Sequence, residues 1–170
     1  MLENDKIIEE FKKSLSVTVK SIGKSDSIEI NFVKESSSIN GNKINLTEPN
    51  LNLLANNLNY IRADADSIAL EIRFHNNEVH DKFLSQNQLS NKIFESIERS
   101  RVEAKGSKIF KGIESNIFKK HQTDLNDISF QKNGENELTK AFRYVSYCEL
   151  TEKKLDGKFN SYKKIIKQKL

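Results

Sequence analysis

The feature of this sequence that most constrains its fold is a line of apolar residues that recurs every three or four positions after Pro49. Its members are Leu51, Leu54, Leu58, Ile61, Ala65, Ile68 and Ile72. Because an α-helix turns by about 100° per residue, this spacing places the whole line on one face. Pro49 favours a helix start, since the first turn does not use its missing N–H. We therefore expect one long helix that continues to about Phe83.

A polar row runs along another side of the same predicted helix. Asp66, Arg73 and His80 follow one another at intervals of seven residues, and Arg62 lies four residues before Asp66. A seven-residue step returns to within about 20° of the same direction, so these side chains share one side. Such a row is typical either of exposed ion pairs on a soluble helix or of a polar network against a neighbouring element.

A second long helix is predicted from residue 89 to about residue 121, with apolar side chains on one face. That face consists of Phe94, Ile97 and Ala104. Gly106 and Gly112 interrupt the later half, and each glycine costs about 1 kcal/mol relative to alanine inside a helix. The two glycines indicate a kink, or the close approach of another backbone.

Arg101 falls on the apolar face of this second helix. An unpaired charge in a core is costly, so we expect a carboxylate to accept its hydrogen bonds. The available carboxylates are Asp64, Asp66 and Glu98, with Glu103 close by in the sequence. The two long helices are therefore expected to lie antiparallel, with a polar network between them.

Ahead of these helices, the sequence predicts a shorter helix and a β-hairpin. Apolar residues step by three and four over residues 8–22, and Gly23 is placed to end that helix as a left-handed cap. Alternating apolar residues then predict two strands within residues 27–46, with a turn at Asn40 and Gly41. A lone hairpin is only marginally stable, so it is expected to lie on the helices.

After a polar connection over residues 124–136, apolar residues at helical spacing predict a further helix over residues 138–148. Cys148, the only cysteine, lies on its apolar face and is expected to be a buried structural thiol. Lysines dominate residues 153–169. That composition is typical either of a solvated helix face or of a basic arm that contacts phosphate or an acidic partner.

These elements predict a mainly α (α+β) fold: a bundle of long antiparallel helices with a small β-hairpin near the N-terminus. We expect residues 1–124 to carry the first helix, the hairpin and the long helical pair, and residues 125–170 to add helices on the same domain. The net charge of +4 over 170 residues is weakly basic and does not by itself indicate nucleic acid. The lone cysteine and the absence of a long apolar run favour a cytoplasmic protein without a membrane-spanning helix.

Two histidines raise the question of a metal site. Zinc proteases space two histidines four residues apart on a helix, so that both reach one ion. His75 and His80 are five apart, which on a continuous helix separates them by about 140°. We expect no metal site, nucleotide site or catalytic residue in this chain. His75, which continues the apolar line, is expected to be a hydrogen-bonded core histidine, His80 a surface or interface residue, and His121 a partner of a helix end.

Two motifs lie on the predicted long helices. The first is an R-x-x-x-D-x-x-A-L pattern followed by an arginine and two histidines, and the second is E-x-x-R-V-E-A-x-G. The matching positions are Arg62, Asp66, Ala69, Leu70, Arg73, His75, His80, Glu98, Arg101, Val102, Glu103, Ala104 and Gly106. In combination this stretch of about sixty residues resembles the amino-terminal region of the CobT subunit family of the aerobic cobaltochelatase.

The resemblance implies a non-catalytic subunit in the ATP-dependent insertion of Co²⁺ into hydrogenobyrinic acid a,c-diamide, a step of aerobic cobalamin biosynthesis. The implied partners are an AAA+ ATPase subunit and a large chelatase subunit. ATP, Mg²⁺ and Co²⁺ would be used by the complex, with no cofactor in this chain. The acidic linker and the carboxy-terminal von Willebrand A-type domain of the family have no counterpart here, so we expect the chain to correspond to the amino-terminal part alone.

Our leading hypothesis is an assembly module whose polar network either fixes the helix pair or docks the ATPase. The alternative is a basic helical nucleic-acid-binding or general protein-interaction domain that uses the lysine-rich C-terminal residues. We expect no membrane partner, and a homo-oligomer is compatible with both hypotheses. The candidate motif or interface residues are Arg62, Asp66, Arg73, His75, His80, Glu98, Arg101, Glu103 and Gly106.

Overall fold

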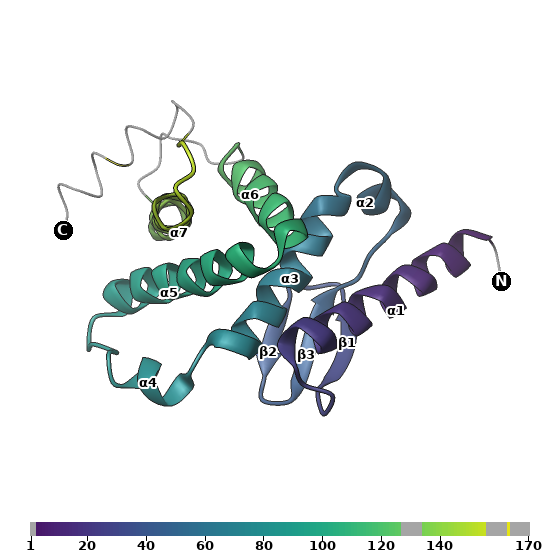
Figure 1. The fold of residues 1–170 in the computed structure, drawn as a ribbon, viewed down its shortest axis with the longest axis horizontal. Helices are drawn as coiled ribbons and strands as arrows, with labels where there is room; N and C mark the ends of the chain where they lie inside the picture. Colours follow the sequence, from purple (N-terminus) through teal and green to yellow (C-terminus); the bar gives the residue numbers. More distant parts are fainter. Residues whose placement is uncertain (1–2, 127–133, 156–162, 164–170) are drawn as a thin grey trace. The chain divides into compact units, whose positions relative to one another are not determined.

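A computed structural model describes residues 3–126, 134–155 and 163 of the chain (Figure 1). In that part the fold is mainly helical with a small sheet near the N-terminus, which confirms the predicted fold class. The chain divides into two compact units, Met1–Phe74 with Ser115–Lys120 and His75–Glu114 with His121–Leu170. No described helix is long and apolar enough to cross a membrane. In chain order the elements are α1 (Glu3–Gly23), β1 (Glu29–Val33), β2 (Ser38–Asn40), β3 (Lys43–Thr47), α2 (Leu51–Asn56), α3 (Leu58–Phe74), α4 (Asn77–Asp81), α5 (Gln88–Ile109), α6 (Lys111–Asn126) and α7 (Glu135–Thr151).

The core of the first unit forms where α1 and the sheet pack against α3. The apolar line that predicted a helix supplies the buried face of α3, because its members at three- and four-residue steps point the same way. Burial of such a face is the main favourable term in folding. The buried members of this core are Leu15, Val19, Ile28, Ile44, Leu46, Ile61, Ala65, Ile68 and Ala69.

α1 ends at Gly23, as predicted, but Gly23 does not form a left-handed cap, so that part of the prediction was wrong. The residue with a positive φ is Lys24, at 53°. Gly23 is buried, and a Cβ atom there would lie 3.3 Å from Cγ2 of Ile72 and 3.6 Å from the backbone oxygen of Ala69. The glycine is therefore required by the close approach of α1 to α3 and not by the turn that follows.

Gly23→Leu is expected to lower the free energy of unfolding by about 1 kcal/mol or more, because the added atoms would overpack the contact with α3. The matched control is Gly112→Ala on α6, where an added Cβ would meet nothing within 4 Å. That control should raise the free energy of unfolding by about 0.5 kcal/mol, through the helix preference of alanine. Urea unfolding followed by circular dichroism measures both changes, and equal effects of the two substitutions would contradict the close contact.

The sheet contains three strands instead of the predicted two-stranded hairpin. β2 and β3 are antiparallel, and Gly41 in the turn between them has a φ of 58°, so the predicted turn position is confirmed. β1, however, pairs with β3 in parallel, with Ile30 opposite Ile44. The error arose because alternation of apolar residues does not encode strand direction. The short strand β2, centred on Ile39 in a polar stretch, returns the chain before β3 begins.

The long helix predicted to continue to Phe83 is divided into α2, α3 and α4. Asparagines stand at both divisions. Asn57 caps the end of α2 and donates its backbone N–H to the Leu53 oxygen. Asn76 precedes α4, and its side-chain oxygen accepts a hydrogen bond of 3.0 Å from the Val79 backbone. The Asn76 side chain thus competes for a backbone hydrogen bond, which the apolar spacing does not reveal.

The second predicted long helix is interrupted at Phe110, between Gly106 and Gly112, which confirms the irregularity that the glycines indicate. Phe110 adopts an extended conformation, with φ of −121° and ψ of 98°, and donates its N–H to the Gly106 oxygen at 2.8 Å. The chain then continues as α6, which extends beyond the predicted end of the helix.

In the second unit, α5 packs against α7. Phe142 and Val145 of α7 are buried and contact Ile93 and Ile97 of α5. Cys148 is also buried, as predicted, and burial raises the pKa of its thiol to about 11. A thiol with that pKa stays protonated at neutral pH, as expected for a structural cysteine. Most of the lysine-rich C-terminal part lies outside the described residues.

Candidate functional site

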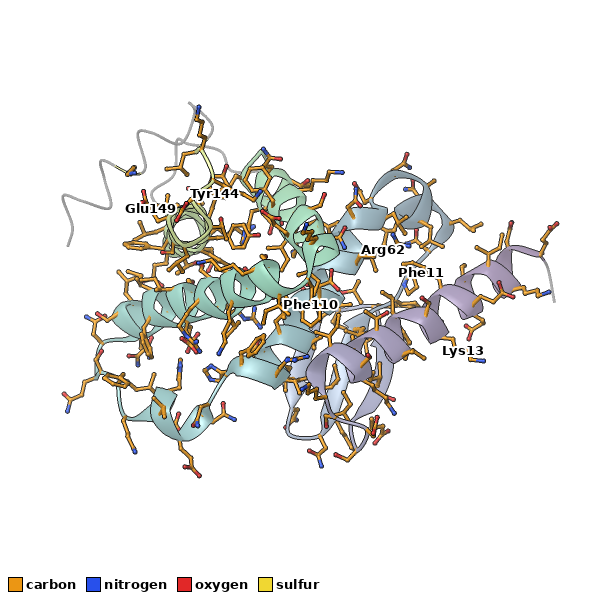
Figure 2. All side chains as sticks on the ribbon, viewed as in Figure 1. Phe11, Lys13, Arg62, Phe110, Tyr144 and Glu149 are labelled. Carbon is orange, nitrogen blue, oxygen red and sulfur yellow. The ribbon has the colours of Figure 1, made fainter. Side chains whose placement is uncertain are left out.

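The two arginines of the predicted polar row on α3 contact aromatic rings. Arg62 is exposed, and its guanidinium carbon lies 5.9 Å from the centre of the Phe11 ring on α1 (Figure 2). Arg73 Nη1 donates a hydrogen bond of 2.9 Å to the backbone oxygen of Ile22, and its guanidinium lies 5.3 Å from the Phe74 ring centre. Because the last carbonyls of a helix have no partner within it, Arg73 stabilises the end of α1.

The two aspartates of α3 differ in burial and in partners. Asp66 is 5% exposed and accepts a hydrogen bond of 3.0 Å from Nδ2 of Asn116 on α6. Burial raises the pKa of Asp66 to about 6, against the lowering effects of the Asn116 hydrogen bond and the Arg62 charge. Asp64 is half-buried and lies 3.9 Å from Nζ of Lys120, which also sits over the Tyr60 ring. Burial thus destabilises the ionised form of Asp66, which belongs to the predicted polar row.

A buried ionic cluster, which we call the Glu103 cluster, joins three helices of the second unit. Glu103 on α5 is 1% exposed, and one of its oxygens accepts a hydrogen bond of 3.0 Å from Nε2 of His121 on α6. Arg143 on α7 forms an ion pair with the same carboxylate. Burial alone would raise the pKa of Glu103, but the charges of Arg143 and His121 outweigh it and hold that pKa well below its usual value.

His121 was predicted to serve a helix end, and this was wrong, because its side chain is buried in the Glu103 cluster. The sequence carried a signal for this, since Ile113, Ile117, His121 and Leu125 follow at four-residue steps and are all buried. Arg143 is not among the predicted residues, because the apolar spacing over residues 138–148 identifies only the apolar face of α7.

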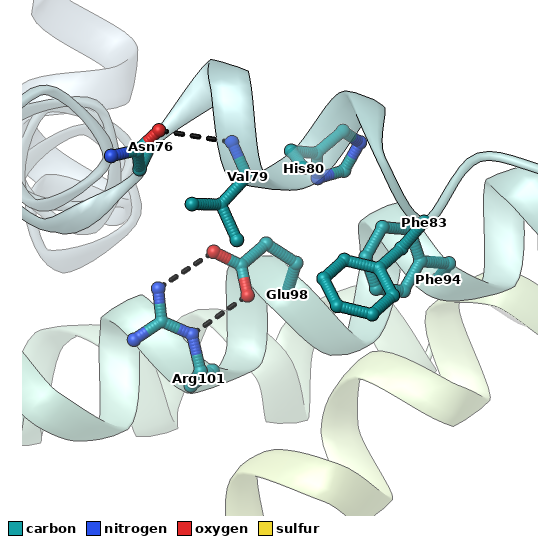
Figure 3. A pocket seen from close by; sticks show the side chains of 7 residues that line it. All are labelled: Asn76, Val79, His80, Phe83, Phe94, Glu98 and Arg101. Carbon is teal, nitrogen blue, oxygen red and sulfur yellow. Dashed lines mark hydrogen bonds and ion pairs between the residues drawn. The ribbon is translucent and has the colours of Figure 1, made fainter.

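Between α4 and α5 lies a cavity of about 290 Å³, which we call the α4–α5 cavity (Figure 3). The His80 ring stacks on Phe94 with ring centres 4.7 Å apart, and the Phe83 ring lies 6.3 Å from Phe94. These three rings form an aromatic wall on one side, and the charged residues of α5 lie at the other. The cavity is lined by Asn76, Val79, His80, Phe83, Phe94, Glu98 and Arg101.

The charged end of the cavity is an ion-pair group centred on Glu98. The Glu98 carboxylate accepts hydrogen bonds of 2.7 Å from both Nε and Nη2 of Arg101. Nδ1 of His75 lies 2.9 Å from the same carboxylate. The hydrogen bonds from Arg101 lower the pKa of Glu98, with a smaller contribution from His75, and the paired carboxylate raises the pKa of Arg101. The fork-shaped contact fixes the direction of the guanidinium at the cavity.

Arg101 pairs with Glu98, one of the three predicted acceptors, but its expected position in the core was wrong. Its side chain is 46% exposed. The core side of α5 is formed by small and polar residues, with Ser100 completely buried and its hydroxyl donating to the Arg143 backbone oxygen at 2.7 Å. Two members of the predicted apolar face do lie toward the core, since Ala104 is buried and Ile97 packs against the buried residues of α7. Only Arg101 was misplaced, because burial on α5 depends on close packing with α7 as well as on hydropathy.

The two histidines come together even though their spacing argued against it. α3 ends at Phe74, so His75 lies in the connection to α4. Its side chain is hydrogen-bonded, as predicted, but it is 14% exposed and therefore does not belong to the core. The His75 and His80 ring centres are 4.9 Å apart in an edge-on arrangement. Across the described part of the chain, no group of three or more His, Cys, Asp or Glu side chains could hold a metal ion.

A protein-family model described as "Cobalamin biosynthesis protein CobT" matches residues 5–153 of the 170-residue chain. The chain belongs to the CobT family. Membership assigns it a role in cobalamin biosynthesis, related to cobaltochelatase. No curated protein and no solved structure matches the sequence or the fold.

The second CobT-like motif, from Glu98 to Gly106, lies entirely on α5 and serves two places. Glu98 and Arg101 line the α4–α5 cavity, whereas Glu103 is the centre of the buried ionic cluster. Gly106 is buried and accepts the hydrogen bond that ends α5. One face of this motif therefore holds the second unit together, and the other borders an open cavity.

Proposed function

We propose that this chain is a non-catalytic assembly subunit of an ATP-dependent cobaltochelatase. In this proposal it works in the cytoplasm with an AAA+ ATPase subunit and with a large subunit that holds hydrogenobyrinic acid a,c-diamide and receives Co²⁺. Co²⁺ is then a substrate of the complex, and ATP with Mg²⁺ is used by the ATPase. The match to the CobT family over residues 5–153 is the observation that carries the proposal.

The chemistry of the motif residues supports a holding role over a bond-making one. A general acid or base must present a titratable group to a substrate. Glu103 is committed to His121 and Arg143 in a buried cluster, and Glu98 is committed to Arg101. These groups are therefore suited to fixing helices and to shaping a surface.

The proposal is tested by mixing the purified chain with the AAA+ ATPase subunit and measuring the elution of the two by size exclusion, in the presence of ADP or of a non-hydrolysable ATP analogue. We expect co-elution with at least one nucleotide, and Co²⁺ insertion by the large subunit only when both proteins are added. Separate elution under every nucleotide condition would contradict the assembly role. Insertion of Co²⁺ without this chain would contradict its place in the complex.

A further inference from the structure

The rim of the α4–α5 cavity exposes a cluster of large apolar side chains to water. Phe83 is 68% exposed and Val79 is 49% exposed, and Leu84 next to them is 43% exposed. These three residues follow one another on α4 and the turn after it. Clustered exposed apolar side chains beside an aromatic pocket and an arginine are typical of sites that bind another protein.

His80 supplies a second, independent observation. Its Nδ1 atom is buried and makes no hydrogen bond to any residue that the structure describes. Burial of a polar nitrogen without a partner costs free energy, and an occupant that turns the ring far enough to reach this atom with a hydrogen-bonding group recovers it. A peptide backbone carries such a group at every residue. The occupant is therefore expected to offer a polar backbone atom close to an apolar side chain.

The cavity is large enough to take a single side chain and lies at the lower end of the sizes known for ligand sites. Sites for whole small molecules span about 300–1,000 Å³, and the α4–α5 cavity has about 290 Å³. Its aromatic wall of His80, Phe83 and Phe94 suits an aromatic or branched aliphatic side chain that stacks on a ring.

The charges beside the cavity define the sequence around that side chain. The exposed residues of α5 from Arg101 onward include Lys105 and Lys108, and the three directions fall within about 60° around the helix. On α4, the exposed acidic residues Glu78 and Asp81 lie about 150° around the helix from the midpoint between Val79 and His80, which line the cavity. Glu98 offsets one of the three positive charges on α5, and the surface next to the cavity keeps a net positive charge that complements carboxylates.

We propose that the α4–α5 cavity receives an aromatic or branched aliphatic side chain from an acidic segment of the partner protein, with a carboxylate of that segment against Arg101 and Lys105. The inference rests on the proposed function in one respect: the partner is the AAA+ ATPase subunit. The cavity therefore acts as the docking surface of this chain, and the ion pair between Glu98 and Arg101 positions the guanidinium for the partner's carboxylate.

The test uses Val79→Trp, which fills the cavity from a half-exposed position, and Val17→Trp as a matched control. Val17 is 61% exposed on α1, in the other compact unit, so it carries the same chemical change without touching the cavity. Short random peptides displayed on phage are selected on the unmodified chain. We expect the selected peptides to combine an aromatic or aliphatic residue with a nearby Asp or Glu. Val79→Trp should weaken their binding by about tenfold or more, and Val17→Trp should leave it unchanged.

A second measurement separates this inference from the proposed function. Both variants are tested for co-elution with the ATPase subunit after circular dichroism has shown unchanged folding. Loss of co-elution for Val79→Trp alone supports the cavity as the docking site. Full co-elution of Val79→Trp overturns the docking inference and leaves the assembly role standing. Peptides without an acidic preference, or peptides that bind Val79→Trp as tightly as the unmodified chain, also overturn it.

Discussion

Glu103→Ala is expected to lower the free energy of unfolding by about 3–5 kcal/mol, the usual cost of removing one partner from a buried ion pair. The substitution leaves the Arg143 guanidinium and the His121 ring in a site that has lost its carboxylate. It also removes the contact that joins α5, α6 and α7. Urea unfolding followed by circular dichroism at neutral pH measures the change.

The matched control is Glu95→Ala, which removes the same group from an exposed position on the same helix. Exposed charges contribute about 0–1 kcal/mol, so its free energy of unfolding should stay close to that of the unmodified chain. Glu103→Gln keeps the shape and separates the loss of charge from the loss of packing. A loss below about 1 kcal/mol for Glu103→Ala would show that the cluster is not a stabilising contact.

The same carboxylate makes stability depend on pH in a definite direction. Because the pKa of Glu103 is held below the value of 4.5 that it has in the unfolded chain, the unfolded state binds the proton more tightly. Its contribution to stability is complete above about pH 5 and is lost as the pH falls through the lowered pKa. The difference in stability between the unmodified chain and Glu103→Gln should therefore shrink on acidification.

The helical faces of the first unit could be predicted from the sequence, because burial there follows hydropathy. Leu15 and Val19 on α1, and Ile61 and Ile68 on α3, repeat at helical spacing and are all buried. The ends of the helices could not be predicted from hydropathy. Asn76 begins the separate helix α4 through a side-chain hydrogen bond, and such local competition leaves the apolar spacing unchanged.

The predicted candidate residues fall into groups that spacing on a single helix could not reveal. Asp66 pairs with Asn116, which is fifty positions away in the sequence. Glu103 pairs with Arg143, forty positions away. Side-chain spacing identifies neighbours within one helix, whereas these partners are set by the packing of separate helices. The sequence therefore indicated which polar residues matter but not which residue each one contacts.

The aromatic wall of the α4–α5 cavity was missed for a related reason. The sequence predicts a continuous helix to about Phe83 and does not show that a separate short helix, α4, precedes that residue. α4 begins after Asn76 as a separate helix, and Phe83 in the turn after it lies 6.3 Å from Phe94 between ring centres. A single local error in helix length thus concealed the cavity.

Asp66→Asn is expected to raise the free energy of unfolding at pH 8, by up to about 3 kcal/mol. Burial raises the pKa of Asp66 from 3.8 to about 6, and each tenfold change in proton affinity corresponds to about 1.4 kcal/mol. Its ionised form is therefore less stable in the folded chain than in the unfolded chain. Asparagine removes the charge and keeps an oxygen that can accept the hydrogen bond from Asn116.

The sign of the pH dependence distinguishes this explanation from a simple packing effect. Between pH 3.8 and about 6 the folded chain binds the Asp66 proton more tightly, so the stability of the unmodified chain falls as the pH rises through that window. The advantage of Asp66→Asn should appear over the same window, level off above it and vanish near pH 4.

Asp64→Asn is the matched control, because it makes the same change two residues away on α3 at a carboxylate that lies beside Lys120. Asp64→Asn loses the attraction between Asp64 and Lys120 and removes no deeply buried charge. The free energy of unfolding at pH 8 should therefore stay unchanged or fall slightly. A lower stability of Asp66→Asn at every pH would show that the carboxylate holds an ion pair in the folded chain. A higher free energy of unfolding at pH 8 would instead show that Asp66 lowers the stability of the fold. Proteins keep such destabilising residues where function requires them.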